Sequence, residues 1–188
     1  MLGLALHDCI INNRRSNHSV VCNSWLGVAH GQTSSGVSEC DTQTGFISQI
    51  TDSQLTSSSS WSGLGVGNSR LSSGYSWSAG GNSAGQYIQA DFGALRRIER
   101  IGTKGRGNYP QWVTSYTFAY SVDGSTYEYI LNDDNSHRVF QANANQNTEV
   151  VNDLDDVYVA RYVRLVVQTW YSHISLRWEV YGCDLGTT

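Results

Sequence analysis

The stretch that decides the fold is Trp170-Tyr-Ser-His-Ile-Ser-Leu-Arg-Trp-Glu-Val-Tyr-Gly-Cys183. Successive side chains of a β-strand point to opposite faces of a sheet, so alternation of apolar and polar residues marks a strand. Four apolar side chains of this stretch fall on one face: Ile174, Leu176, Trp178 and Val180. Arg177 and Glu179 fall on the other face, where we expect them to form a structural ion pair. The stretch therefore predicts a strand that ends in a cysteine.

The four cysteines stand at positions 9, 22, 40 and 183. Cys40 and Cys183 bracket almost the whole β-patterned part of the chain, which suggests a disulfide between its first and last strands. Closing so long a loop stabilises the fold by about 5 kcal/mol in the chain-entropy model. Cys9 and Cys22 would then close a small N-terminal loop, although two other pairings and free thiols stay open. Disulfides persist in oxidising compartments, so the cysteines predict a secreted or cell-surface protein.

Composition narrows the class of protein further. The 188 residues suffice for one domain with a proper core, and 15% charged and 11% aromatic residues favour a β-sandwich or barrel. A net charge of −4 argues against nucleic-acid binding through phosphate neutralisation. No apolar run approaches the ~20 residues of a membrane span. The apolar start, residues 1–6, lacks a basic flank and is too short for a whole signal peptide.

Alternating segments recur from Gly45 to the end of the chain. The clearest is Trp112–Val122, and the turn residues Asp123-Gly124 separate it from Tyr127–Leu131, which predicts a β-hairpin. Two further alternating segments are Tyr87–Phe92 and Val157–Gln168. Many short strands between turn residues predict an all-β sandwich or barrel. Residues 1–39 show no sustained period, and we expect an irregular extension that contains the only N-glycosylation sequon, at Asn17.

One segment gives an ambiguous pattern. Its apolar residues, Leu95, Ile98 and Ile101, fit one face of a helix as well as a strand. Because the segment is short and flanked by glycines, we predict a strand.

Ten phrases of the sequence occur in an order that carries a family resemblance. They are Asp52–Ser59, Arg70-Leu71, Ser76–Ser78, Gln86–Gly93, Gly105–Gly107, Trp112–Tyr116, Tyr120–Gly124, Ala160–Arg164, Trp170 and Ile174–Cys183. The ordered set, with a cysteine at each end, resembles the discoidin family, also called the coagulation-factor type C domain. Each phrase alone is weak, but the set is highly specific and covers residues 40–183, about three quarters of the chain.

The resemblance implies an all-β, jelly-roll-like barrel or sandwich of eight strands whose termini meet at a Cys40–Cys183 disulfide. It divides the chain into an irregular extension (1–39), a discoidin-type domain (40–183) and a C-terminal tail (184–188). Ligands of the family bind at loops, called spikes, that project from one end. Family members are binding modules for cell-surface glycans, collagen, other proteins or anionic phospholipid head groups, so the resemblance implies no catalytic centre.

Two loops resemble those of the discoidin lectins, which favours a cell-surface glycan as the ligand. The segment 104–111 offers a guanidinium, an amide and an aromatic face, and 170–173 offers aromatic stacking beside a histidine. The lectins have an Arg-Gly-Asp triplet where this chain has Arg106-Gly107-Asn108, so carboxylate-dependent integrin-type adhesion is not expected there. The predicted glycan-binding residues are Tyr75, Arg106, Asn108, Tyr109, Tyr171 and His173. The competing interpretations are a structural Arg106 and a merely solvated His173.

An alternative function is peripheral binding to phosphatidylserine. The loop Trp61-Ser-Gly-Leu-Gly-Val66 matches in position the spike that enters membranes in lipid-binding relatives, which predicts a membrane spike of Trp61, Leu64 and Val66. Arg70 is the only basic residue between positions 58 and 95, so attraction to anionic lipid would be weak. Trp61 could equally fold back onto the end of the barrel. Protein–protein adhesion through the same loops is a third interpretation, and the sequence leaves homo-oligomer formation open.

Neither a cofactor nor a metal is predicted. Some carbohydrate-binding relatives hold calcium with an Asp-Gly pair before the Ser/Ala-Trp phrase, whereas the corresponding stretch here, Leu71–Trp77, contains no aspartate. The sequence also lacks the G-x-S-x-G and H-E-x-x-H motifs and a nucleophilic Cys/His signature. We therefore expect a binding protein and not an enzyme.

Overall fold

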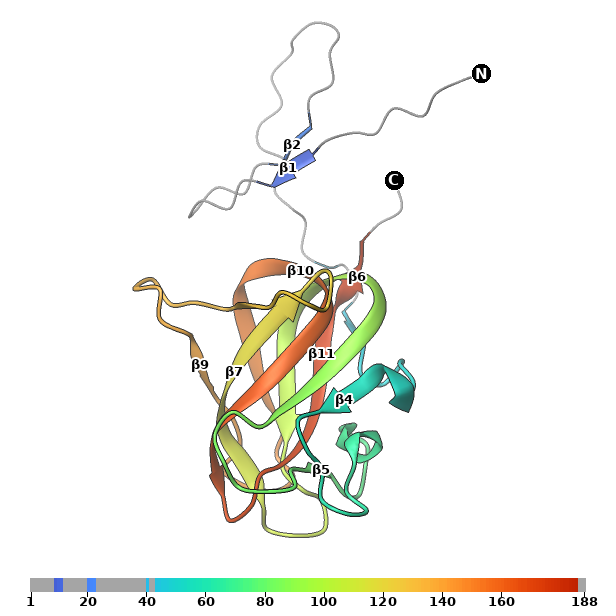
Figure 1. Cartoon of the computed structure of the whole chain (residues 1–188), viewed down its shortest axis with the longest axis vertical. Coiled ribbons are helices and arrows are strands. Elements are labelled where there is room, and N and C mark those ends of the chain that lie inside the picture. The colour runs from blue at the N-terminus through green and yellow to red at the C-terminus, as the bar shows by residue number, and fades with distance from the viewer. Residues whose placement is uncertain (1–8, 12–19, 23–39, 41–42, 186–188) are drawn as a thin grey trace, which may run out of the picture. The chain divides into compact units, whose positions relative to one another are not determined.

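Figure 1 shows the computed structural model, which describes residues 9–11, 20–22, 40 and 43–185. The chain divides into two compact units, Met1–Ser38 and Glu39–Thr188. In the first unit, β1 (Cys9–Ile11) and β2 (Val20–Cys22) pair antiparallel, and their backbone register sets Cys9 opposite Cys22. The side chains of these two cysteines and the Asn17 sequon lie outside what the structure describes, so the Cys9–Cys22 disulfide stays a prediction.

The second unit consists of antiparallel β-strands. They are β3 (Thr44–Gly45), β4 (Leu55–Ser57), β5 (Trp77–Ser78), β6 (Tyr87–Lys104), β7 (Trp112–Ser121), β8 (Glu128–Tyr129), β9 (Val139–Gln141), β10 (Val150–Tyr171) and β11 (Ser175–Asp184). Two 3-10 helices, η1 (Asp52–Gln54) and η2 (Val66–Ser69), flank β4 and precede β5. The strand order is β3-β11-β6-β10-β7-β8, with β4 paired to β6, β5 to β11 and β9 to β7. The all-β class is confirmed, in a sheet that does not close.

The core lies on one face of the long strands. Leu165 of β10 is opposite Ile88 of β6 on one side and Phe118 of β7 on the other, and all three side chains are fully buried. The four side chains predicted to share a face of β11 are also fully buried: Ile174, Leu176, Trp178 and Val180. Removing such side chains from water is the main favourable contribution to folding. No helix of the described residues is long and apolar enough to span a membrane.

Two predictions of local structure are confirmed, the β-hairpin at Asp123-Gly124 and the strand around Ile98. The hairpin around Asp123-Gly124 joins β7 to β8, where Ala119 is opposite Tyr129. Asp123 Oδ1 accepts hydrogen bonds from two backbone N–H groups of the turn, and Gly124 has a φ of 76°, which favours glycine. The ambiguous segment around Ile98 lies within β6, so the predicted strand is confirmed.

The predicted ion pair between Arg177 and Glu179 is wrong. Both side chains are buried, but each binds backbone groups instead of the other. Glu179 accepts hydrogen bonds from the N–H groups of Ile47, Ser48 and Val180. Burial raises the pKa of Glu179, and these N–H donors oppose that rise. Alternation placed both residues on the correct face but could not identify their partners, which lie far away in sequence.

The predicted Cys40–Cys183 disulfide is present, with a Cα–Cα distance of 5.7 Å across a sequence separation of 143. Cys183 lies near the end of β11, whereas Ser175 begins this strand. Eight residues at about 3.3 Å each separate them by roughly 26 Å. The disulfide and the loops at the start of β11 therefore occupy opposite ends of the sheet (Figure 1).

Candidate functional site

Loops from distant parts of the sequence gather at the end of the sheet where β11 begins (Figure 1). Residues 105–111 connect β6 to β7, and residues 172–174 connect β10 to β11. The loop at 58–65 and the loop at 72–76 both precede β5, which pairs with the start of β11. Because antiparallel neighbours bring a strand's start next to its partner's end, these segments become neighbours only in the folded chain.

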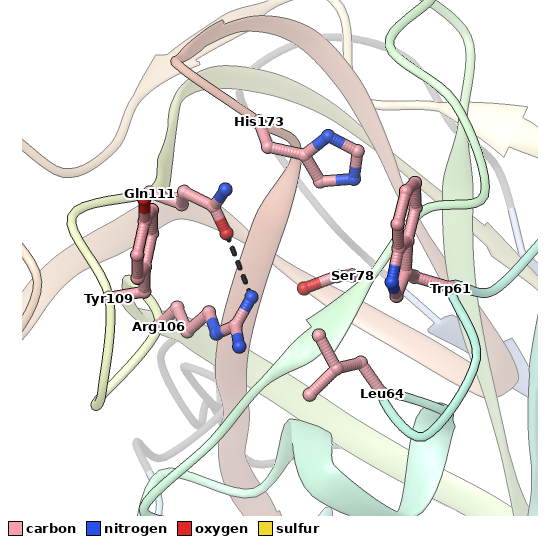
Figure 2. Close-up of a pocket in the computed structure, with 7 residues that line it drawn as sticks. All are labelled: Trp61, Leu64, Ser78, Arg106, Tyr109, Gln111 and His173. Atoms are coloured by element: carbon pink, nitrogen blue, oxygen red, sulfur yellow. Dashed lines mark hydrogen bonds between the residues drawn. The ribbon is translucent and has the colours of Figure 1, made fainter.

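A cavity of about 260 Å³ opens among these loops, as Figure 2 shows. Its lining residues are Trp61, Leu64, Ser78, Arg106, Tyr109, Gln111 and His173. A concave site that combines aromatic faces with a few convergent polar groups is typical of small-ligand binding. The cavity brings together three residues predicted to bind glycan and two predicted to form a membrane spike. Ser78 and Gln111 were not predicted.

Arg106 is held by neighbours in its own loop. Its Nε donates to Asn108 Oδ1 at 2.7 Å, and its Nη1 donates to Gln111 Oε1 at 3.0 Å. The guanidinium lies over the Tyr109 ring, 5.5 Å from the ring centroid, which is cation–π geometry. Asn108 does not line the cavity but orients the guanidinium that does. This loop therefore presents a fixed cation beside an aromatic face.

Two loops at the rim touch through their backbones. The N–H of Gly107 donates to the Tyr75 carbonyl at 3.2 Å. A Cβ on Gly107 would lie 2.5 Å from the Gly74 carbonyl oxygen, so only glycine permits this approach. Tyr75 itself is 53% exposed and is not among the residues that line the cavity.

His173 forms the opposite wall of the cavity. Its Nε2 lies 2.9 Å from the Ala79 carbonyl oxygen. A carbonyl only accepts, so Nε2 carries the proton in the neutral ring and Nδ1 is left as an acceptor. The Trp61 ring meets the imidazole edge-on, with 5.6 Å between centroids and an interplanar angle of 82°. Asn82 fixes this loop by donating to Ser172 O and accepting from the N–H of Ile174.

Tyr171 lies outside the cavity although it ends β10 only two residues before His173. Its ring stacks on Trp112, with 4.3 Å between centroids and an angle of 12° between planes. Trp112 is its partner in the pairing of β10 with β7, which explains the stack. About half of Tyr171 is exposed, so it remains available beside the cavity without lining it.

A row of three buried serines includes Ser78, which lines the cavity. Ser76 Oγ lies 3.0 Å from Ser78 Oγ, which lies 2.8 Å from Ser175 Oγ. Ser175 in turn donates to Gln111 Oε1 at 3.3 Å. Since each hydroxyl has one proton, this last bond makes Ser78 the donor to Ser175. Ser78 is fully buried, so its hydroxyl is engaged within this row. In the sequence, the serines at alternate positions did not indicate that they would form this hydrogen-bonded row.

Arg177 supports the loops from beneath. Its guanidinium donates to five oxygen atoms: Gly105 O, Leu71 O, Ser73 O, Gln146 O and Asn147 Oδ1. These acceptors come from three separate segments, and two of those segments form the rim of the cavity. Burial lowers the pKa of Arg177. One buried side chain thus ties the loop end together.

The expected membrane spike is not exposed as a unit. Trp61 is 54% exposed, but Leu64 is only 8% exposed and Val66 packs against the core within η2. The N–H of Leu64 donates to Trp61 O, and the N–H of Ser78 donates to Leu64 O. These bonds hold the loop against β5 and turn Leu64 inwards.

No group of three or more His, Cys, Asp or Glu side chains in the described part of the chain is placed to hold a metal ion. The acidic residues of β10, Asp153 and Asp155, pair with Arg100 and Arg138. The cavity itself is lined by no carboxylate. The site's chemistry is therefore that of aromatic contact and hydrogen bonding from neutral and cationic groups.

Comparison with known proteins identifies the family. The F5/8 type C domain model matches residues 54–180, more than half of the chain, and the chain belongs to this family. Mouse lactadherin is 36% identical over 109 residues, which are 57% of this chain and 23% of that protein. Discoidin-2 of Dictyostelium discoideum is 35% identical over 115 residues, which are 61% of this chain and 43% of that protein.

The solved structure of wild-type discoidin II from Dictyostelium discoideum matches with a TM-score of 0.70 and 28% identity. The match covers 79% of this chain and 61% of that one. The predicted discoidin resemblance is confirmed by these findings. The chain spans less than half of the length of mouse lactadherin and of discoidin-2.

Proposed function

We propose that this chain is a secreted or cell-surface recognition module that binds a saccharide of cell-surface glycans. We assign the module to residues 40–183. The observation that carries the proposal is the convergence of Trp61, Arg106, Tyr109 and His173 around one cavity at the loop end. The Cys40–Cys183 disulfide supports an oxidising, extracellular location. The discoidin-lectin resemblance of the loops at 104–111 and 170–173 supports a glycan as the ligand.

The geometry suits a pyranose ring. The faces of sugar rings are apolar and their edges carry hydroxyl groups, so a sugar site needs an aromatic surface flanked by hydrogen-bonding groups. Tyr109 and Trp61 supply aromatic surface from opposite sides of the cavity (Figure 2). His173 Nδ1 supplies an acceptor, and Arg106 supplies a donor. A volume of about 260 Å³ accommodates about one sugar residue.

Binding to anionic phospholipid is the second candidate, because Trp61 is exposed. Insertion of one tryptophan without Leu64 and Val66 buries little apolar area, and the energy gained scales with that area. Liposome co-sedimentation with phosphatidylserine vesicles tests this function. We expect weak binding to the vesicles, and we expect the change Leu64→Ala to leave this binding unchanged. Tight binding that is lost when Trp61→Ala and Leu64→Ala are combined would support the membrane function instead.

A glycan array followed by calorimetric titration of the best hits tests the saccharide proposal. We expect Tyr109→Ala and His173→Ala each to weaken binding by about tenfold or more, since stacking and a buried hydrogen bond each contribute about 1–2 kcal/mol. Val122→Ala, a truncation of a similarly exposed side chain on the β7–β8 turn, is the control. Absence of binding to any glycan under conditions where a control lectin binds would refute the proposal.

A further inference from the structure

The charge of the cavity points to a narrower class of ligand. Arg106 makes its two side-chain hydrogen bonds to amide oxygens, Asn108 Oδ1 and Gln111 Oε1, which are neutral. Among the described residues, no ion pair involves Arg106, and no residue that lines the cavity is an aspartate or glutamate. A guanidinium stays charged at any physiological pH. Its positive charge is therefore not compensated within the site.

Two other cations at this end of the sheet are compensated by carboxylates. Arg70 pairs with Asp52, and Lys104 lies 3.6 Å from Glu149. Arg177 also lacks a carboxylate partner. It is buried beneath the loops, and its hydrogen bonds go to carbonyl and amide oxygens. Arg106 at the cavity and Arg177 beneath it thus both lack a carboxylate partner among the described residues. Their field favours an anion there.

Donors outnumber acceptors on the cavity wall. Gln111 Oε1 already accepts from Arg106 and Ser175, so the amide turns its Nε2 donors to other partners. Trp61 offers only an N–H, and Arg106 Nη2 makes no hydrogen bond to any described residue. Against these donors stand fewer side-chain acceptors, His173 Nδ1 and the Tyr109 hydroxyl oxygen. Figure 2 shows the Gln111 amide and the Arg106 guanidinium side by side at the cavity.

We infer that the cavity selects an acidic saccharide, one that carries a carboxylate, over its neutral counterpart. This inference rests on the proposed saccharide binding. A hydroxyl both donates and accepts, whereas a carboxylate only accepts and matches the planar fork of a guanidinium. Arg106 and Gln111 bind the carboxylate, while His173 accepts from a ring hydroxyl. Charge-assisted hydrogen bonds are about twice as strong as neutral ones, which gives the acidic sugar its advantage.

The experiment compares sugars that differ only in this group. Methyl galacturonide is titrated against methyl galactoside, and methyl glucuronide against methyl glucoside, by calorimetry with the full chain at about 50 mM salt. In at least one pair we expect the acidic sugar to bind about fivefold to tenfold more tightly. We expect this ratio to shrink at about 500 mM salt, because salt screens the contact with a partly exposed guanidinium.

The change Gln111→Glu is the sharpest variant. It keeps the oxygen that accepts from Arg106 and Ser175, preserves the size of the side chain and supplies the missing carboxylate. We expect the ratio of acidic to neutral affinity to fall below one. Arg100→Gln is the matched control: it changes the net charge by the same amount but lies on β6 beside Asp153, away from the cavity. This control should leave the ratio unchanged.

The possible outcomes distinguish the preference for an acidic saccharide from saccharide binding itself. Equal or tighter binding of the neutral sugars, with binding still lost in Tyr109→Ala, would overturn the preference for acid and leave saccharide binding supported. No binding of any of the four glycosides or of any glycan on an array would overturn both. Arg106-dependent binding to phosphatidylserine vesicles without saccharide binding would also overturn both and assign the charge to a lipid carboxylate.

Discussion

Replacement of Arg177 by methionine should loosen the loop end of this domain more than any other part. Methionine keeps an unbranched apolar stem in the space of the arginine but removes all five hydrogen bonds that the guanidinium donates. Each carbonyl or amide oxygen left without its partner costs about 1 kcal/mol. The total of about 5 kcal/mol is an upper bound, because water can reach some of the freed oxygens.

Part of this loss is offset. Burial lowers the pKa of Arg177, which shows that the charged guanidinium is itself disfavoured where it lies, and methionine removes that cost. We therefore expect a net destabilisation of about 3 kcal/mol. For a domain of this size each kcal/mol lowers Tm by about 2–4 °C, so the expected decrease is about 6–12 °C.

Calorimetric unfolding measures the decrease in Tm, and hydrogen exchange identifies the segments that are destabilised. Exchange should accelerate first in the segments that Arg177 joins, 71–75, 105–111 and 143–148, while the amides of β6 and β10 stay protected. Arg100→Met, which removes an exposed guanidinium, is the control and should lower Tm by no more than about 2 °C. A decrease in Tm of less than about 3 °C, or hydrogen exchange that accelerates evenly over the sheet, would refute the role assigned to Arg177.

Three further predictions concern other parts of the domain. Gly107→Ala should weaken saccharide binding by about tenfold in calorimetric titration, because its Cβ would meet the neighbouring loop's backbone; Gly81→Ala, whose Cβ meets nothing within 4 Å, should not. Replacing Cys40 and Cys183 together by serine should destabilise the domain by about 5 kcal/mol in urea titrations, yet leave the affinity of the remaining folded protein unchanged, since the site is roughly 26 Å away. The hydrogen bond from Arg161 lowers the pKa of Asp91, so this interaction stabilises the fold above the unfolded pKa of about 3.9 and is lost as the pH falls below it. Asp91→Asn should therefore flatten the decrease in Tm between about pH 4 and pH 2, and an unchanged slope would contradict this assignment.

The strands could be predicted because their signals are local. Ile174, Leu176, Trp178 and Val180 alternate in sequence and are all buried, since the backbone period of two sets both facts. The segment around Ile98 shows the limit of this logic, because spacing alone fitted a helix equally well. The short length of the segment and its flanking glycines favoured a strand, and the segment does lie within strand β6.

The site could be predicted only in part because it is assembled from non-local contacts. Arg106, Tyr109 and His173 were identified from loops that resemble those of discoidin lectins, and they do line one cavity. Gln111 and Ser78 were missed, since their roles depend on hydrogen bonds that cross between strands. Leu64 was assigned to an exposed spike because its loop matches in position the spike of lipid-binding relatives, whereas backbone bonds to β5 turn it inwards.

Under the proposed saccharide binding, the specificity of this site is set by partners of the ligand-facing residues as much as by those residues. A guanidinium paired with a carboxylate is a neutral unit that suits hydroxyl groups, while the same guanidinium paired with two amides remains a cation. In this chain Asn108 and Gln111 hold Arg106 in place without neutralising it. The change from amide to acid at either position alters charge while preserving shape. Two chains with the same arginine in the same loop can therefore prefer different sugars, and a family assignment based on the fold and that arginine does not determine which sugar each one binds.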